Sequence, residues 1–472
     1  MFKKLFVRVS LYGLAPQVST IASFFALPII TQDLTRLDYG VYGVIQAYTS
    51  AFNVLQTLGM SVVLSNSFYK HPNHFKWHWR QIHGFLSLWS FFFAMFLGCI
   101  LYFVIPEEAA ENKWYIIAMN FISVGLLGTT QTIFYRYYHL SNQAFTLAIR
   151  TVIIGILTVL VNIYTISYLK LGYMGWFISA FISSVISFSF FSFPIYFKHQ
   201  LLPIFNFKRK TIKKALDVSL PTVPHYYSTY LLNISDRAIM DGLGVNVKNI
   251  GLYNLAYSFG GYFSSLVDAI SLAVSPTYLQ LYKNKDASSI KWLTYILQGG
   301  LFLVGFLICI WLKEIFQLLI RNTSLHEAYY LAIIIIMSYT YRPMYLAAIN
   351  KLFFMEKTKS LWRVSFIAGV SNVILNLIFI PIYGIKAAAI ITFVSYMYMG
   401  YSGYFLKDFR KDNTLNLYPL LWLLATVGLL VSAYLLVDVS VIIKATITIV
   451  MLAVTLVLFL NRHKYLPPSM QI

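Results

Sequence analysis

Two charged residues lie deep inside long apolar stretches of this sequence, where a charge is costly. Arg342 stands in the stretch 327–350, roughly 13 Å along a helix from Lys351. Asp268 lies well inside the stretch 250–281. A guanidinium at such a depth can hold a phosphate through two parallel hydrogen bonds, and a carboxylate can carry a proton. If the two residues pair with each other, both are structural, and the sequence leaves these alternatives open.

A second group of polar residues lies in the stretch 215–243. Asp236 and Arg237 are adjacent, so on a helix they point about 100° apart and can serve different partners. We predict that they either gate and bind a substrate or form an ion pair at the rim of the membrane. Aromatic rings can stack on sugar rings, and three candidates for that contact follow one another in this stretch: Tyr226, Tyr227 and Tyr230.

A histidine and three prolines could make these stretches move. His225 follows Pro224, where it could couple proton entry to movement or serve as a buried packing residue. Pro16, Pro221 and Pro224 each remove a backbone hydrogen bond and bend a helix. We predict that these prolines form hinges, with static kinks as the alternative.

We predict no metal site and no catalytic residue. His74 and His78 have the i, i+4 spacing that suits zinc, but no cysteine or acid lies near them. Aromatic and basic neighbours favour an anchor at the membrane interface instead. The histidines that crowd this loop are His71, His74, His78 and His83.

The composition says which elements must position these residues. Hydrophobic residues make up 59% of the 472 residues and charged residues only 11%. A soluble enzyme or a disordered chain cannot have this balance, whereas stretches of about 20 apolar residues cross a bilayer as helices. We therefore predict an all-α polytopic membrane protein with fourteen spans, at 9–31, 41–68, 83–105, 114–135, 145–169, 173–197, 215–243, 250–281, 289–312, 327–350, 361–382, 385–406, 416–437 and 440–461.

The positive charges set the predicted orientation. If both termini lie on one side, the loops on the opposite side hold only nine of the 36 Lys and Arg residues, and Arg342 lies within a span. This bias predicts that both termini are cytoplasmic. The net charge of +20 is explained by the cytoplasmic loops, so we predict no nucleic-acid partner.

An internal repeat divides the predicted spans. Gly40 and Tyr42 open the second span as Gly251 and Tyr253 open the eighth, and Gly172 and Gly384 lie at equivalent tight turns. We predict two pseudo-symmetric six-helix bundles, residues 1–205 and 206–407, that enclose a cavity. Two additional helices and a tail follow in residues 408–472.

Three stretches, 35–42, 220–253 and 370–396, carry a family resemblance. Their distinguishing residues are Gly40 and Tyr42, then Pro221, Pro224, Asp236, Arg237, Gly251 and Tyr253, then Asn372, Asn376, Pro381, Gly384, Ala388 and Ala389. This ordered set resembles the Wzx-type polysaccharide (O-antigen) flippases of the multidrug/oligosaccharidyl-lipid/polysaccharide exporter superfamily. One departure is Ala387, where a glycine is usual.

The resemblance implies a flippase that moves an oligosaccharide on undecaprenyl pyrophosphate to the outer leaflet by alternating access. Arg36, in the first stretch, then joins the substrate-binding candidates. The resemblance implies that no cofactor is needed. It further implies that transport is coupled to a proton or sodium gradient, and that a polysaccharide polymerase and a chain-length regulator are partners. A lipid II flippase and a cation-coupled exporter of small molecules are the alternatives. A membrane enzyme is disfavoured, because we find neither a large outer loop nor an Asp-x-Asp site.

Overall fold

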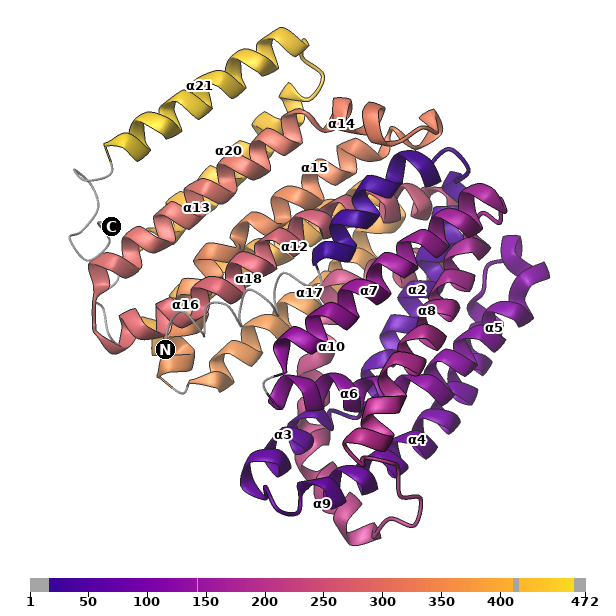
Figure 1. The fold of residues 1–472 in the computed structure, drawn as a ribbon. Helices are drawn as coiled ribbons and strands as arrows, with labels where there is room; N and C mark the ends of the chain where they lie inside the picture. The colour runs from indigo at the N-terminus through magenta and orange to yellow at the C-terminus, as the bar shows by residue number, and fades with distance from the viewer. Residues whose placement is uncertain (1–16, 142, 356, 411–415, 462–472) are drawn as a thin grey trace. The chain divides into compact units, whose positions relative to one another are not determined.

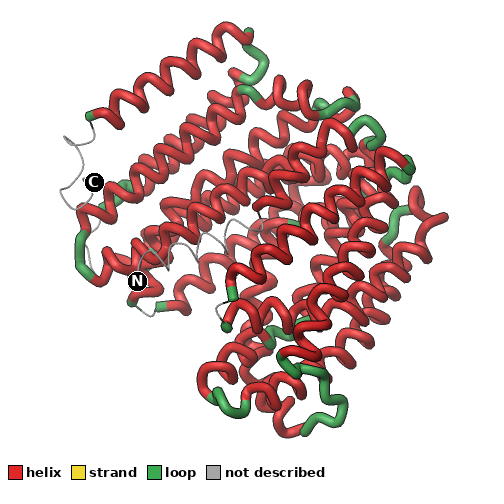
Figure 2. The backbone as a smooth tube through the Cα atoms, viewed as in Figure 1, coloured by secondary structure: helices red, strands yellow, loops and turns green. Residues whose placement is uncertain are grey.

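The computed structural model describes residues 17–141, 143–355, 357–410 and 416–461, and every regular element in these ranges is a helix (Figure 2). All fourteen predicted stretches are largely helical where they are described, which confirms the all-α membrane class. Within the described residues, nine helices are long and apolar enough to cross a membrane. The chain forms two compact units, residues 1–251 and 252–472. The predicted division after residue 205 rests on the repeat and stays a prediction.

The first unit is a bundle in which α4 packs against α2, α5 and α6, and α8 packs against α6 and α7 (Figure 1). Its elements are the helix Gln17–Ile30, α2 (Arg36–Gln56), α3 (Ser61–Lys70), α4 (Phe75–Val104), η1 (Glu107–Asn112), α5 (Lys113–Phe121), η2 (Ile122–Leu127), α6 (Gly128–Leu140), α7 (Ala144–Ile163), η3 (Tyr164–Tyr168), α8 (Tyr173–Phe193), η4 (Pro194–Lys198), α9 (Arg209–Ser219), η5 (Leu220–Thr222), α10 (Val223–Asn233), α11 (Ser235–Gly242) and the start of α12 (Val247–Lys283).

Two predicted spans of this unit are interrupted. The stretch 41–68 breaks between α2 and α3, where Gly59 adopts a φ of +67°. The stretch 215–243 breaks at Leu220–Thr222 and again at Ile234. The break at Gly59 lies against the break at Leu220–Thr222, because a Cβ added at Gly59 would lie 2.4 Å from Thr222 Oγ1.

The stretch 35–42 owes its pattern to helix capping and close packing. Thr35 and Asp38 form a capping box at the start of α2. Asp38 Oδ1 also accepts a hydrogen bond from the backbone N–H of Tyr173 at 2.8 Å, which ties α2 to the start of α8. A Cβ on Gly40 would lie 2.0 Å from the Val247 carbonyl oxygen, so a glycine is needed where α2 crosses α12.

Two glycines make the tight turns that the repeat predicts. Gly172 precedes α8 with a φ of +53°, and Gly384 precedes α18 (Ile385–Tyr401) with a φ of +66°. Residues that carry a Cβ rarely adopt this backbone conformation. The two turns differ in their surroundings: a Cβ at Gly172 would lie 2.5 Å from Asp38 Oδ1, whereas one at Gly384 would meet nothing within 4 Å.

Alanine at these two turns is expected to have unequal effects. Gly384→Ala carries only the backbone strain, about 1–3 kcal/mol. Gly172→Ala carries the same strain and also displaces the carboxylate that caps α2 and binds α8, so it lowers the thermal unfolding midpoint in detergent further. Equal shifts for the two variants would contradict the role given to Asp38.

The second unit is organised around the buried helix formed by α15, η7 and α16. Residues 328–354 are the most enclosed of the apolar helices, whereas α20 and α21 expose most of their surface. The elements after α12 are α13 (Ala287–Ile310), α14 (Leu312–Leu319), η6 (Thr323–Leu325), α15 (Ala328–Ser338), η7 (Tyr339–Tyr341), α16 (Arg342–Phe354), α17 (Thr358–Tyr383), α18, η8 (Ser402–Phe405), α19 (Lys407–Arg410), α20 (Pro419–Leu436) and α21 (Val441–Leu460).

Polar contacts fasten the α20–α21 turn to the rest of this unit. Asp438 accepts hydrogen bonds from Lys313 Nζ at 2.8 Å, Tyr329 Oη at 2.9 Å and Tyr330 Oη at 2.6 Å. A few residues on, Lys444 forms a buried ion pair with Glu314 at 2.7 Å. These contacts hold two helices that otherwise present apolar side chains to their surroundings.

The Asp438 cluster is expected to stabilise the fold only above acidic pH. Hydrogen bonds from Lys313 and Tyr330 lower the pKa of Asp438 to about 2. Because the folded-state pKa is depressed, the contribution is complete above the ordinary carboxylate pKa of about 4 and is lost as the pH falls towards 2. The thermal unfolding midpoint of the wild-type protein should therefore be higher than that of Asp438→Asn at pH 7, and the difference between the two midpoints should shrink below pH 4. A gap that stays constant down to pH 2 would contradict this assignment.

Candidate functional site

Arg342 and Asp268 form an ion pair in the second unit. The helix tightens to a 3₁₀ turn at Tyr339–Tyr341. Arg342 is the first residue of α16, and Pro343 is the second. Arg342 Nη2 donates to Asp268 Oδ1 of α12 at 2.6 Å. The sequence left pairing open as the structural alternative, and the structure has this pair.

Two neighbours orient the guanidinium further. Arg342 Nε donates to Ser271 Oγ at 3.3 Å, and Nη1 donates to Tyr341 Oη at 3.1 Å. Ser271 lies three residues after Asp268, so both lie on one face of α12. The Tyr345 ring lies 5.8 Å from the guanidinium carbon, a cation–π contact.

The ion pair is partly open. The Arg342 side chain is 27% exposed and the Asp268 side chain 50% exposed. A guanidinium has five N–H donors, and three are directed at described partners. The arrangement can therefore hold an anion without first breaking the pair.

Aromatic rings that the sequence reasoning missed surround this arginine. Tyr341 stacks on Tyr396 of α18 at 5.1 Å between ring centroids, and Tyr339 contacts the same ring at 5.3 Å. The signal was present in the spacing of Tyr339, Tyr341 and Tyr345 around Arg342. The first two are buried and support the arginine, whereas Tyr345 is only partly buried.

The other predicted charged pair lies in the first unit and is buried. Asp236 and Arg237 follow the break at Ile234 and are 0% and 5% exposed. Arg237 Nη1 donates to the Asn233 carbonyl oxygen at 3.2 Å. This burial agrees better with a packing role than with an open binding surface, and substrate contact by these residues stays a prediction.

A further contact in α11 escaped the sequence reasoning. Asp241 Oδ2 accepts a hydrogen bond from Tyr48 Oη of α2 at 3.0 Å. Asp241 lies four residues after Arg237, within the apolar stretch already singled out, and that spacing was the available signal.

The predicted aromatic and hinge residues of this unit have varied positions. Tyr227 and Tyr230 are partly buried, with their rings edge to face at 6.3 Å. Pro221 lies in η5 and Pro224 near the start of α10, and both are exposed. The side chains of His225 and Tyr226, together with Pro16, lie outside the described residues. The hinge role stays a prediction.

Two other arginines, Arg36 and Arg136, lie on helices of the first unit. Arg36 is the first residue of α2 and is partly buried. Arg136 donates from Nε and Nη2 to the Ser61 carbonyl oxygen at 3.1 and 2.9 Å, which fastens α6 to α3. Within the described ranges, no group of three or more His, Cys, Asp or Glu side chains could hold a metal ion.

Comparison with solved structures relates this fold to known transporters. The lipid II flippase MurJ, in an inward closed conformation, aligns with a TM-score of 0.65 at 16% identity, covering 96% of this chain and 99% of its own. The Vibrio cholerae MATE transporter VcmN aligns with a TM-score of 0.57 at 13% identity, covering 87% and 98%. An inward-facing multidrug resistance MATE transporter aligns at 0.55 and 13%, covering 89% and 96%. A search of curated proteins finds no match.

Residues 7–282 match the family described as polysaccharide biosynthesis protein, a match that covers more than half of the chain. The family assignment thus comes from the sequence, and the fold assignment from the solved structures and from the apolar helices of both units. The chain is a multi-pass membrane protein that belongs to the polysaccharide biosynthesis protein family.

Proposed function

We propose that this protein is a flippase for a lipid-linked oligosaccharide, which it moves from the cytoplasmic to the outer leaflet of the bacterial inner membrane. Its family and its likeness to a lipid II flippase over nearly the full length of both chains support this proposal. The substrate is an oligosaccharide on undecaprenyl pyrophosphate. Movement requires binding and release on alternate sides, and it requires no covalent chemistry and no cofactor.

The observation that carries the proposal is the partly open Arg342–Asp268 pair. A charge in a membrane helix costs about 2.5–3.5 kcal/mol on insertion scales, so an arginine there needs a compensating role. Asp268 offsets part of this cost, and the guanidinium keeps donors that fit a phosphate oxygen. The pair thus offers a phosphate contact on the membrane helices of the second unit.

The driving force has an electrical part. An inside-negative potential favours outward movement of an anion by about 2.3 kcal/mol per charge per 100 mV. We extend the proposal to coupling with a proton or sodium gradient through Asp268, whose side chain is 50% exposed. A polysaccharide polymerase and a chain-length regulator then act on the product at the outer face.

Transport in proteoliposomes tests the proposal. The purified protein is reconstituted with a fluorescent undecaprenyl pyrophosphate oligosaccharide, and a membrane-impermeant quencher measures how fast the label crosses the bilayer. We expect movement that accelerates when a potassium diffusion potential drives the anion across. Labelled phosphatidylcholine should stay in its leaflet. Failure to move any lipid-linked sugar, with correctly folded protein, would refute the proposal.

Lipid II is the second candidate substrate, because the lipid II flippase aligns over 96% of this chain. The same vesicles loaded with labelled lipid II separate the two substrates. Faster movement of the lipid-linked oligosaccharide supports the role in polysaccharide synthesis. Movement of lipid II alone would contradict that role and assign lipid II as the substrate. Complementation of a strain lacking surface polysaccharide provides the matching test in cells.

A further inference from the structure

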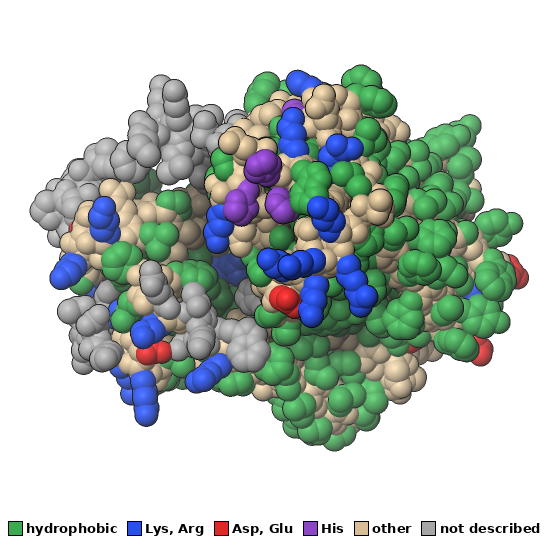
Figure 3. All heavy atoms as spheres, turned by 90° about the horizontal axis from the view of Figure 1, so that it is seen from below, with side chains coloured by type: hydrophobic (Ala, Val, Ile, Leu, Met, Phe, Trp, Pro, Cys, Tyr) green, Lys and Arg blue, Asp and Glu red, His purple; other side chains and the backbone are tan. Residues whose placement is uncertain are grey.

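A pocket of about 430 Å³ lies in the first unit between α3, α4 and α9. It is far in sequence from Arg342, and of the residues discussed above only His71 and His78 line it. Figure 3 views the molecule from the end where α3 and α9 lie in Figure 1, and Lys, Arg and His side chains gather on that face. We call it the basic pocket; its lining residues include Lys70, His71, His78, Lys208, Lys210 and Lys214.

The wall formed by α9 is fixed to α4 by the segment that precedes it. His83 Nδ1 and the Leu201 carbonyl oxygen lie 2.9 Å apart, and Arg80 Nε donates to the Leu202 carbonyl oxygen at 3.0 Å. Just before α9, the backbone N–H of Lys208 donates to Gln81 Oε1 at 3.0 Å. These contacts fix the position at which α9 begins and therefore the positions of its lysines.

The opposite wall is equally fixed. Trp79 of α4 is fully buried, and its indole N–H donates to the Leu64 carbonyl oxygen at 3.1 Å and to Ser67 Oγ at 2.9 Å. Both acceptors lie on α3, so the indole locks α3 against α4. Ser67 itself lines the basic pocket, which is therefore preorganised on both sides.

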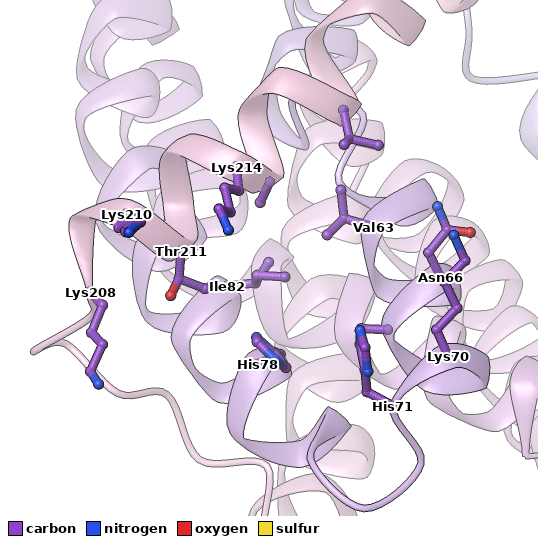
Figure 4. A pocket seen from close by; sticks show the side chains of 13 residues that line it. Val63, Asn66, Lys70, His71, His78, Ile82, Lys208, Lys210, Thr211 and Lys214 are labelled. Atoms are coloured by element: carbon purple, nitrogen blue, oxygen red, sulfur yellow. The ribbon is translucent and has the colours of Figure 1, made fainter.

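The lining combines positive charge with apolar surface. Figure 4 shows Lys214 extending from α9 towards Ile82 and His78 of α4, while Lys70 and His71 lie on the far side. None of the described lining residues is acidic. Val63, Ile82, Ala215 and Val218 supply an apolar wall, and Val218 is 50% exposed.

This combination selects an amphiphilic anion. Ammonium groups from two helices bind phosphate oxygens through charge-assisted hydrogen bonds. A free soluble anion would gain nothing from the apolar wall, whereas a lipid would lay the start of its chain along it. These lysines belong to the segments 69–82 and 198–214 between predicted spans, on the predicted cytoplasmic side, where anionic lipid headgroups attract basic residues.

We propose that the basic pocket binds the phosphate group of a membrane lipid. The phosphate can belong to an anionic phospholipid or to the polyprenyl carrier of the substrate. The binding itself does not depend on the proposed function, and only the polyprenyl source rests on it. In that case the pocket receives the lipid-linked head at the membrane surface before transport.

Lipid binding to the full-length protein in detergent tests the proposal by native mass spectrometry. The probes are undecaprenyl phosphate, phosphatidylglycerol, phosphatidylcholine and inorganic pyrophosphate. We expect both anionic lipids to bind more tightly than phosphatidylcholine. Preference for undecaprenyl phosphate identifies the carrier as the source, and equal affinity for phosphatidylglycerol identifies bulk phospholipid. Pyrophosphate that binds as tightly as the lipids would overturn the lipid part of the proposal.

A matched pair of double variants locates the binding. Lys70→Gln/Lys214→Gln removes one lysine from each side of the pocket, and the expected loss of affinity is about 100-fold, roughly tenfold for each charge-assisted hydrogen bond. Lys76→Gln/Lys213→Gln removes the same charge from nearby exposed positions outside the lining and should change the affinity by less than about threefold. Equal losses for the two variants would show diffuse surface attraction and overturn the site.

Transport is measured separately in the same preparations. Loss of lipid binding with transport retained confirms the basic pocket and leaves the flippase proposal standing. Wild-type protein that moves its substrate but binds none of the anionic lipids at this site refutes the pocket alone.

Discussion

Arg342→Ala is expected to slow movement of the lipid-linked oligosaccharide by about 10- to 100-fold. The change removes a charge-assisted contact to phosphate, which contributes roughly 1.5–3 kcal/mol. It also leaves the Asp268 carboxylate without the partner that lies 2.6 Å away. Initial rates in the proteoliposome assay measure the effect. Arg342→Lys keeps the charge but loses the planar fork, so it should recover only part of the rate.

The double variant Arg342→Ala/Asp268→Ala separates function from structure. It removes both charges, so no lone carboxylate remains in the helix bundle. If the arginine binds phosphate, the double variant should fold and still be slow. A double variant that transports at the wild-type rate would mean that the pair serves the fold only, and Arg342 would lose its assigned role.

Glu314→Ala is expected to destabilise the second unit by about 3 kcal/mol. Lys444 is fully buried, and Nζ contacts both Glu314 carboxylate oxygens, at 2.7 and 2.9 Å. Breaking a buried pair typically costs about 3–5 kcal/mol because one charge is left uncompensated. The lower end applies here, since the Glu314 side chain is 27% exposed. Unfolding titrations in mixed micelles measure the free energy.

Two further variants make this expectation specific. Glu314→Met/Lys444→Met removes both charges and should recover most of the lost stability, because an apolar pair of similar volume packs in the same space. Lys313→Ala breaks the neighbouring pair with Asp438, in which the two side chains are 37% and 42% exposed, and should cost less stability than Glu314→Ala, because Tyr329 and Tyr330 still bond Asp438. If Lys313→Ala is as harmful as Glu314→Ala, burial is not the reason for the effect.

The helical framework was predictable because hydropathy is a local property. The stretches around Arg342 and Asp268 stood out since a charge in an apolar run is visible without knowing the fold. The turns at Gly172 and Gly384 were also foreseeable, because tight turns favour residues without a Cβ. The break near Gly59 was not foreseen, since an isolated glycine in an apolar run is a weak signal.

Partnerships across the chain could not be read in the same way. Lys444 lies in α21 and pairs with an acid 130 residues earlier, and nothing in the local sequence indicates that partner. The sequence singled out the histidines near residue 75 as an anchor at the membrane interface, and it counted the lysines near residue 210 only within the charge of the cytoplasmic loops. Only the packing of α9 on α3 and α4 brings them to one pocket.

The fastening of the segment before α9 has a consequence for biogenesis. His83 is buried, and its ring nitrogen meets the Leu201 carbonyl oxygen, 118 residues later in the chain. At about 5–20 residues per second, a ribosome needs on the order of 10 seconds to reach that acceptor after His83 has been made. The end of α4 that carries His83 therefore lacks this hydrogen-bond partner until the segment before α9 has been synthesised.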